Sequence, residues 1–119
     1  MSEPSDRSLV RRYPQVSAFA KRMRAELWAN RHKGDRPGWL SMSNRQAWGE
    51  IAWHLGKLAG ALKAQDRDLI LELCADIANG ALMLDDMVRT RGPVDVCRCG
   101  IPVDEPSPGC AWHEQRDAT

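Results

Sequence analysis

The pattern of apolar and polar positions predicts three long helices and no sheet. Apolar residues recur at spacings of three and four along three segments, which is the period of an α-helix with one buried face. The predicted helices cover about residues 14–32, 44–64 and 66–91. The apolar stripe of the second helix consists of Ala47, Ile51, Leu55, Leu58 and Leu62. No segment alternates apolar and polar residues over a long enough stretch to predict a sheet of any size. The predicted fold class is therefore all-α.

Local signals mark where these helices begin and end. Pro14 suits the first turn of a helix, and Gly34 is suited to ending one. Residues 35–38, which follow Gly34, are expected to form a loop. Ser43 and Gln46 have the spacing of a capping box, in which each side chain bonds to the backbone of the other residue. Asp66 or Asp68 can cap the third helix. Because so few residues join the second and third helices, these two helices are predicted to pack as antiparallel neighbours.

The chain divides into three parts. Residues 1–12 are predicted to be a flexible basic N-terminus, residues 13–92 a helical domain, and residues 93–119 a short tail. A helical hairpin with one additional helix leaves apolar surface uncovered. We therefore expect a homodimer or a larger homo-oligomer that completes an antiparallel helical bundle.

Composition narrows the class of protein. The 119 residues include 43% hydrophobic and 28% charged residues, which is typical of one small globular domain and excludes wholesale disorder. No apolar run is long enough for a transmembrane helix or a secretory signal, which predicts a cytoplasmic protein without membrane contact. Residues 1–33 carry eight Lys or Arg against three acids, whereas residues 64–119 carry five against eleven. This gradient fits either the binding of polyanions at one end and cations at the other, or an unevenly charged surface.

Polar side chains form one narrow stripe on each of the last two predicted helices, beside the apolar seam. These stripes consist of Glu50, His54 and Lys57, and of Glu72, Asp76, Asn79 and Asp86. Glu72 and Asp76 are one turn apart and repel each other unless a cation lies between them. Oxygen ligands of this kind suit Mg²⁺ or Mn²⁺, with Asn79 and Lys57 available to a bound anion. The alternative is that Glu72 pairs with Lys57 or an arginine across the hairpin and that no metal binds.

Three segments of the chain resemble those of a known family. The segments are Asn30–Gly34 followed by Trp39, Lys57–Leu62, and Glu72–Asn79 with Met83 and Asp86. Over about residues 19–88 the chain is similar to the small phage-encoded MazG-like proteins, which belong to the all-α nucleoside triphosphate pyrophosphohydrolases. The resemblance implies a helical bundle, usually oligomeric, in which carboxylate-held Mg²⁺ cleaves a nucleoside triphosphate to the monophosphate and pyrophosphate. A phage protein of this family would act in the cytoplasm of the bacterial host.

The chain departs from the family at its metal-binding motifs. His54 and Lys57 occupy the two glutamate positions of the first motif, Glu-x-x-Glu. Leu73 occupies the glutamate position of the second motif, Glu-x-x-Asp. The residues that carry over directly are Asp76 and Asn79, and the candidate replacement carboxylates are Glu50 and Glu72. The expected metal site therefore consists of Glu50, Glu72, Asp76 and Asp86. The departures from the family motifs imply either an altered metal preference or a loss of catalysis.

If the protein is an enzyme of this kind, several further residues are candidates for roles at the active site. His54 and Glu50 are the candidate catalytic residues, with His54 serving as a general base or as a ligand to Mn²⁺, unless it only bonds to a neighbour. The candidate substrate-binding residues are Lys33, Trp39, Lys57 and Asn79. Trp39 can stack on a base, or it can be an anchor in the core or at a subunit interface. Lys33 and Arg31 either contact phosphates or are plain surface cations.

The tail contains a second candidate metal site. Cys97, Cys99, Cys110 and His113 supply the donors of a tetrahedral Cys3His zinc site, although Cys-x-Cys is shorter than the common spacing. A disulfide or free thiols are the alternatives. Four protein ligands leave no open position, so Zn²⁺ would stabilise the tail rather than take part in catalysis.

Two functions follow from these observations. The favoured function is a metal-dependent nucleoside triphosphate pyrophosphohydrolase acting on NTPs or dNTPs. The alternative is a noncatalytic MazG-like adaptor that contacts nucleic acid or protein through its basic N-terminus and zinc tail. Converging carboxylates on the predicted stripes favour the enzyme, whereas carboxylates engaged in salt bridges favour the adaptor.

Overall fold

The protein is all-α in a computed structural model that describes residues 3–91. The elements are α1 (Asp6–Arg12), α2 (Pro14–Ala29), a 3₁₀ turn (Arg31–Lys33), α3 (Arg36–Leu40), α4 (Asn44–Ala64) and α5 (Arg67–Arg91). Residues 3–91 contain no strand. The predicted fold class and the three long helices, now α2, α4 and α5, are confirmed. The predicted zinc tail, residues 93–119, lies outside the described residues.

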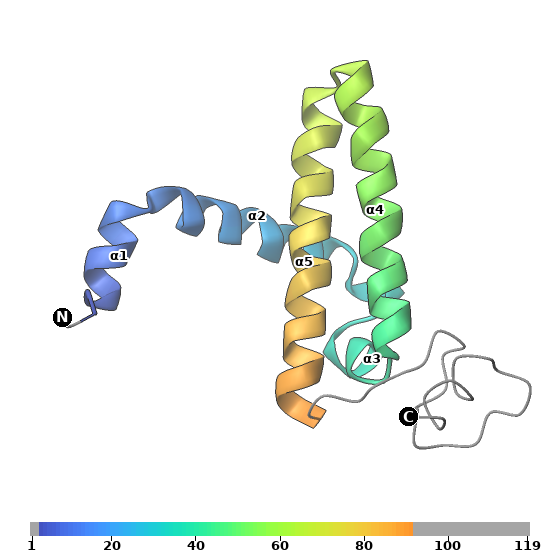
Figure 1. The fold of residues 1–119 in the computed structure, drawn as a ribbon, viewed down its shortest axis with the longest axis horizontal. Helices are drawn as coiled ribbons and strands as arrows, with labels where there is room; N and C mark the ends of the chain where they lie inside the picture. Colours follow the sequence, from blue (N-terminus) through green and yellow to red (C-terminus); the bar gives the residue numbers. More distant parts are fainter. Residues whose placement is uncertain (1–2, 92–119) are drawn as a thin grey trace, which may run out of the picture.

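α4 and α5 form an antiparallel hairpin whose ends are set by local hydrogen bonds (Figure 1). Ser43 and Gln46 form the predicted capping box, in which the Gln46 backbone N–H donates to Ser43 Oγ and the Ser43 N–H donates to Gln46 Oε1. Gln65 ends α4 in the left-handed conformation at φ 54°. Asp66 Oδ1 then accepts the Leu69 N–H at 3.2 Å and caps α5. The turn between the helices is therefore only two residues long.

Small side chains let the two hairpin helices approach closely. The buried core residues are Ala47, Ala61, Leu73, Ala75 and Met87. Gly80 lies opposite Ile51, and a Cβ atom on Gly80 would come within 2.8 Å of Ile51 Cγ1. A methyl group at position 80 would force Ile51 to move, because packed interiors leave no space for an added carbon atom. This crossing point therefore requires glycine.

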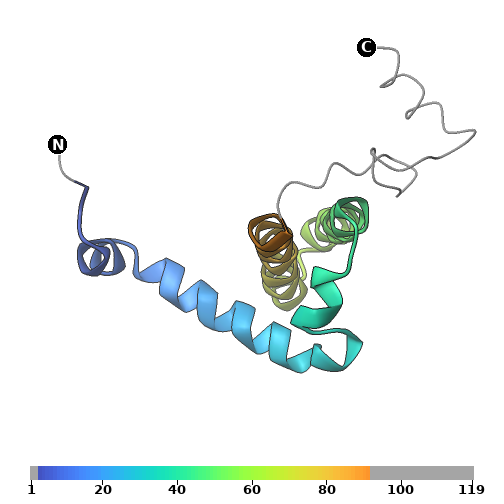
Figure 2. The ribbon, with the colours of Figure 1, turned by 90° about the horizontal axis from the view of Figure 1, so that it is seen from below.

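α2 crosses α5 and continues away from the hairpin as an arm, which has α1 at its far end (Figures 1 and 2). A side-chain hydrogen bond fixes the crossing, in which Asn79 Nδ2 of α5 donates to the Met23 carbonyl of α2 at 3.0 Å. Asn79 is only 4% exposed. The arm therefore packs against the hairpin with its C-terminal half, while Val16 in its first half remains exposed.

Two short helices occupy segments that were predicted to be irregular. α1 lies within residues 1–12, the expected flexible N-terminus, and begins where Ser5 Oγ accepts the Ser8 N–H. α3 lies in the expected loop after Gly34, with Asp35 Oδ1 accepting the Arg36 N–H and Pro37 in the first turn. The expected loop was wrong for residues 36–40, because a side-chain cap and an early proline can start a helix too short to show an apolar period. The flexibility expected for residues 1–12 stays a prediction.

Part of the apolar stripe of α4, which was predicted to lie in the seam between the hairpin helices, faces away from α5. Leu55 and Leu62 were expected in the seam, but they are 45% and 56% exposed. Together with Trp48, which is 61% exposed, they lie seven residues apart along the outer side of α4. Ala52 and Ala59 lie between them and are also exposed. We call Trp48, Ala52, Leu55, Ala59 and Leu62 the α4 outer stripe.

No helix among residues 3–91 is long and apolar enough to cross a membrane.

Candidate metal centre

Three carboxylates from two helices meet where the arm crosses the hairpin. Glu26 of α2 and Glu72 and Asp76 of α5 each offer an oxygen that lies within 4.8 Å of the other two. Glu72 and Asp76 are one turn apart on α5, and the arm brings Glu26 to them from a distant part of the chain. No Lys or Arg of residues 3–91 lies within ion-pair distance of Glu26 or Glu72. No Lys or Arg of the described chain therefore balances the charge of these carboxylates, and the one basic side chain within ion-pair distance is His54, beside Asp76.

The position of Glu26 makes its ionisation less favourable. Partial burial raises the pKa of the Glu26 carboxyl above 4.5, and the negative charges of Asp76 and Glu72 raise the pKa further. A hydrogen bond from the Asn30 side chain offsets part of this shift. A divalent cation among the three oxygens would reverse the effect of the neighbouring charges, because it favours the ionised form of each carboxyl.

His54 of α4 adds a nitrogen donor beside the carboxylates. Its Nε2 lies 3.9 Å from Asp76 Oδ2, and its Nδ1 lies 2.7 Å from the Glu50 carbonyl oxygen. A carbonyl oxygen can only accept, so Nδ1 must carry the proton of that hydrogen bond. In the neutral ring the lone pair is then on Nε2, the nitrogen that faces Asp76. His54 is thus positioned to ligate a cation or to accept a proton.

Asn79 lies one turn beyond Asp76 on α5 and has an unfulfilled acceptor. Its Nδ2 is used by the Met23 carbonyl, but its buried Oδ1 has no hydrogen-bond partner among the described residues. A buried oxygen without a hydrogen bond destabilises the fold, so Asn79 Oδ1 is suited to accept a hydrogen bond from a group outside the described chain. The predicted role of Asn79 as a ligand to a bound group remains a prediction.

The structure does not bring the other predicted metal ligands to this cluster. Asp86 is ten residues from Asp76 on α5, which places it about 15 Å further along the helix axis. Glu50 is exposed on α4, and its carboxylate is not part of the group formed by Glu26, Glu72 and Asp76. The cluster therefore contains Glu26 in place of the predicted Glu50 and Asp86 carboxylates.

The predicted substrate-binding residues are dispersed over the described chain. Lys57 lies with its ammonium 3.7 Å from the centre of the Trp53 ring, so it does not pair with Glu72. Lys33 is exposed in the 3₁₀ turn. Trp39 donates its indole N–H to Asp86 at 2.8 Å. The predicted zinc ligands Cys97, Cys99, Cys110 and His113 are outside the described residues.

Known proteins add nothing to this geometry. No protein-family model, curated protein or solved structure matches the chain.

Asp86, although predicted as a metal ligand, joins α3 to α5. Its Oδ2 accepts from Arg36 Nε at 2.9 Å and from the Trp39 indole, and its Oδ1 accepts from Arg36 Nη2 at 3.0 Å and the Thr90 hydroxyl at 3.2 Å. A bidentate pair with an arginine is a strong and directional contact. These hydrogen bonds hold the pKa of the Asp86 carboxyl far below 3.8.

We expect Asp86→Asn to lower the melting temperature at neutral pH and to flatten its dependence on acid pH. The depressed pKa means that Asp86 stabilises the fold above the ordinary carboxyl pKa and that this contribution is lost as the pH falls toward the folded-state value. The difference in melting temperature between the wild type and Asp86→Asn should therefore shrink as the pH is lowered from about 5. Thermal unfolding at several pH values measures this difference. Asp85→Asn is the control, because Asp85 makes only an exposed pair with Arg89.

Glu26 is the site residue that the sequence patterns missed. It lies on the arm rather than on either hairpin stripe, and its approach to Asp76 depends on how α2 crosses α5. One signal was present, because Glu26 is the only acid between Asp6 and Asp35 in an otherwise strongly basic segment. A single carboxylate beside the apolar face of a basic helix is a candidate for a residue of a functional site.

Proposed function

We propose that the protein is a metal-dependent nucleoside triphosphate pyrophosphohydrolase that converts an NTP or dNTP to the monophosphate and pyrophosphate. The observation that supports this function is the group of Glu26, Glu72 and Asp76, whose oxygens lie within 4.8 Å of one another. The choice of nucleotide and of pyrophosphate as the product rests on the resemblance to the MazG-like proteins. The converging carboxylates favour this function over a noncatalytic adaptor.

The donor set fits a hard divalent cation. Three carboxylate oxygens suit Mg²⁺ or Mn²⁺ and leave coordination positions for phosphate oxygens and water. A nitrogen at His54 makes Mn²⁺ as acceptable as Mg²⁺, because imidazole is a softer ligand than a carboxylate. When bound, such a cation would supply charge neutralisation on the phosphates and a lowered pKa for water.

The side chains of the site would then position the reactants and move the proton. Glu26, Glu72 and Asp76 would hold the cation between the arm and the hairpin. His54 would accept the proton of the attacking water at Nε2, because its Nδ1 is held by the Glu50 carbonyl. Glu50 would thus contribute through its backbone oxygen, which orients the ring.

The test is pyrophosphate release from a panel of canonical and modified nucleotides with Mg²⁺ or Mn²⁺. We expect Asp76→Asn to lower the rate by about 100-fold or more, since even outer partners of metal ligands contribute 10- to 100-fold. Asp85→Asn is the matched control and should keep the wild-type rate. Release that persists in Asp76→Asn would place the chemistry elsewhere. No release from folded wild type with any nucleotide or metal would favour the adaptor instead.

We also infer that the protein is a homodimer formed through the α4 outer stripe. Its five residues follow one another at spacings of four and three, which is the a/d pattern of helices that pack side by side. All five are exposed in the single chain. The two alanines allow a second helix to approach closely, and the larger side chains would fill the space between the helices. A symmetric dimer can use this same surface twice.

A further inference from the structure

The arm presents a basic face that is separate from the metal centre. Lys21, Arg24 and Trp28 follow one another at spacings of three and four along α2, so they lie on one side of the helix. All three are exposed, and Trp28 is 68% exposed. Neither Lys21 nor Arg24 has a carboxylate within ion-pair distance in residues 3–91. These cations are therefore available to an anionic partner.

This face points away from the carboxylates. Lys21, Arg24 and Trp28 lie about 160° to 220° around the helix axis from Glu26. A ligand on this face would not reach the Glu26 carboxylate, and a nucleotide at the metal centre would not cover Trp28. Binding at this face is therefore independent of the proposed enzymatic function.

Arg31 extends the face and lies against its aromatic residue. The Arg31 guanidinium lies 3.7 Å from the centre of the Trp28 ring, and its Nη1 donates to the Trp28 carbonyl oxygen at 2.7 Å. This contact covers one side of the indole and adds a positive charge beside it. The large exposed fraction of Trp28 leaves the other side of the ring open to a flat ligand.

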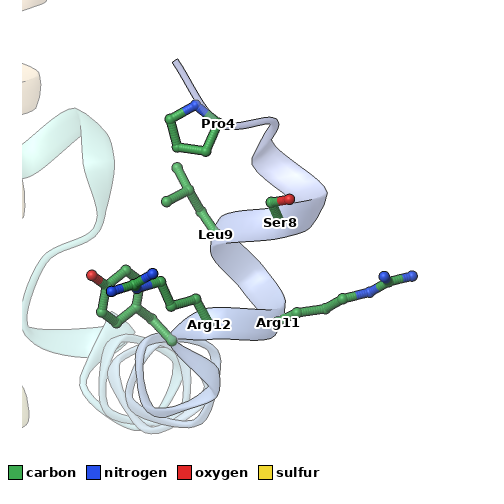
Figure 3. Close-up of a pocket in the computed structure, with 6 residues that line it drawn as sticks. Pro4, Ser8, Leu9, Arg11 and Arg12 are labelled. Atoms are coloured by element: carbon green, nitrogen blue, oxygen red, sulfur yellow. The ribbon is translucent and has the colours of Figure 1, made fainter. Parts of the chain in front are cut away.

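A second group of cations lies on α1 at the end of the arm. Arg7 and Arg11 are one turn apart and exposed. Figure 3 shows Arg11 extending away from the helix. The Arg12 guanidinium lies 5.8 Å from the centre of the Tyr13 ring. The shallow hollow between α1 and the start of α2 is lined by Pro4, Ser8, Leu9, Arg11, Arg12 and Tyr13 and contains no acidic residue. The arm thus carries unbalanced positive charge at both ends.

We propose that the arm formed by α1 and α2 binds single-stranded nucleic acid. Lys21, Arg24 and Arg31 contact phosphates, and an unpaired base stacks on the open side of Trp28. Aligned cations beside an exposed aromatic ring are the two features of surfaces that bind single strands without sequence preference. In a duplex the bases are already stacked within the helix, so Trp28 could not contribute in this way. An anionic membrane is less suited to the α2 face, because Trp28 is the one large apolar residue beside Lys21 and Arg24 there.

The test is the fluorescence anisotropy of a labelled, mixed-sequence DNA single strand of about 20 nucleotides, titrated with the full chain at several salt concentrations. Three phosphate contacts predict a slope of about −2 when the logarithm of the association constant is plotted against the logarithm of the salt concentration. Lys21→Glu combined with Arg24→Glu should weaken binding by at least about tenfold and reduce this slope to about −0.7. Trp28→Ala should weaken binding by about 5- to 150-fold and leave the slope unchanged.

Controls separate this interaction from general charge effects. Arg67→Glu combined with Arg89→Glu changes the net charge by the same amount, at arginines that pair with Asp68 and Asp85 on α5. This variant should bind within about twofold of the wild type. The proposal is overturned if the wild type does not bind the strand at about 50 mM salt, or if the arm variant binds as tightly as this control. Equal or tighter binding of the duplex or of phosphatidylserine vesicles also overturns it. Circular dichroism of each variant verifies that the helices are intact.

Discussion

Leu55→Asp should convert the protein from a dimer into a monomer at concentrations at which the wild type remains associated. Leu55 is the central large residue of the α4 outer stripe and is 45% exposed in the single chain. Burying a fully exposed leucine side chain contributes about 2 kcal/mol, so the exposed 45% of Leu55 contributes about 1 kcal/mol in each of the two subunits. The charge of the new aspartate would also lose hydration on association. The dissociation constant should therefore rise by at least about 30-fold.

Sedimentation velocity over a range of protein concentrations measures this effect. Leu69→Asp is the matched control, because Leu69 is similarly exposed but lies at the start of α5, outside the stripe. It should leave the dimer intact. A wild type that stays monomeric at the highest concentration would contradict the dimer, and a dimeric Leu55→Asp variant would place the interface on another surface.

Glu26→Gln should stabilise the metal-free protein at neutral pH and remove about half or more of its stabilisation by metal. The pKa of Glu26 is raised in the folded state, so its stabilising contribution is complete at low pH and is lost as the pH rises through the carboxyl range. Glutamine cannot ionise, and the metal-free variant should therefore melt at a higher temperature than the wild type at pH 7. The difference should disappear below about pH 4.

Metal binding should reverse this order. At a metal concentration 100 times its dissociation constant, a bound cation stabilises the wild type by about 2.7 kcal/mol. If the Glu26→Gln substitution weakens binding 10- to 100-fold, about 1.4 kcal/mol or less of that stabilisation remains. Thermal unfolding with and without Mn²⁺ measures both effects, and chelation of the metal should restore the metal-free order.

Glu50→Gln is the informative comparison for Glu26→Gln. The sequence pattern assigns Glu50 to the metal, whereas the structure leaves its carboxylate exposed and outside the cluster. Metal should stabilise Glu50→Gln as much as it stabilises the wild type. The opposite result, with metal stabilisation lost in Glu50→Gln and kept in Glu26→Gln, would contradict the site described here.

The sequence predicted the hairpin well because its signals are local. The capping box of Ser43 and Gln46, the Asp66 cap and the helical period each depend on residues within a turn or two of one another. The seam was less predictable, since an apolar stripe can be wider than the surface that one neighbouring helix covers. Leu55 and Leu62 belonged to that stripe but lie on its uncovered side.

The candidate site was predicted only where it lies on the hairpin. Glu72 and Asp76 share one face of α5, and helical spacing alone identifies such a pair. The contribution of Glu26 depends on the hydrogen bond between Asn79 and the Met23 carbonyl, which joins residues far apart in the sequence. No local pattern reports a contact of this kind. The role of Asp86 was missed for the same reason, because Arg36 and Trp39 reach it from a distant short helix.

The short turn at Gln65 and Asp66 also has a consequence for the order of folding. Contacts near this turn join residues close in sequence, so α4 and α5 can pair with little loss of loop entropy. Docking of α2 through Met23 and Asn79 instead closes a separation of 56 residues. We therefore expect the hairpin to form the folding nucleus and the arm to dock afterwards. The three carboxylates would then come together only in the last step. A cation that binds them would therefore slow unfolding more than it would speed folding.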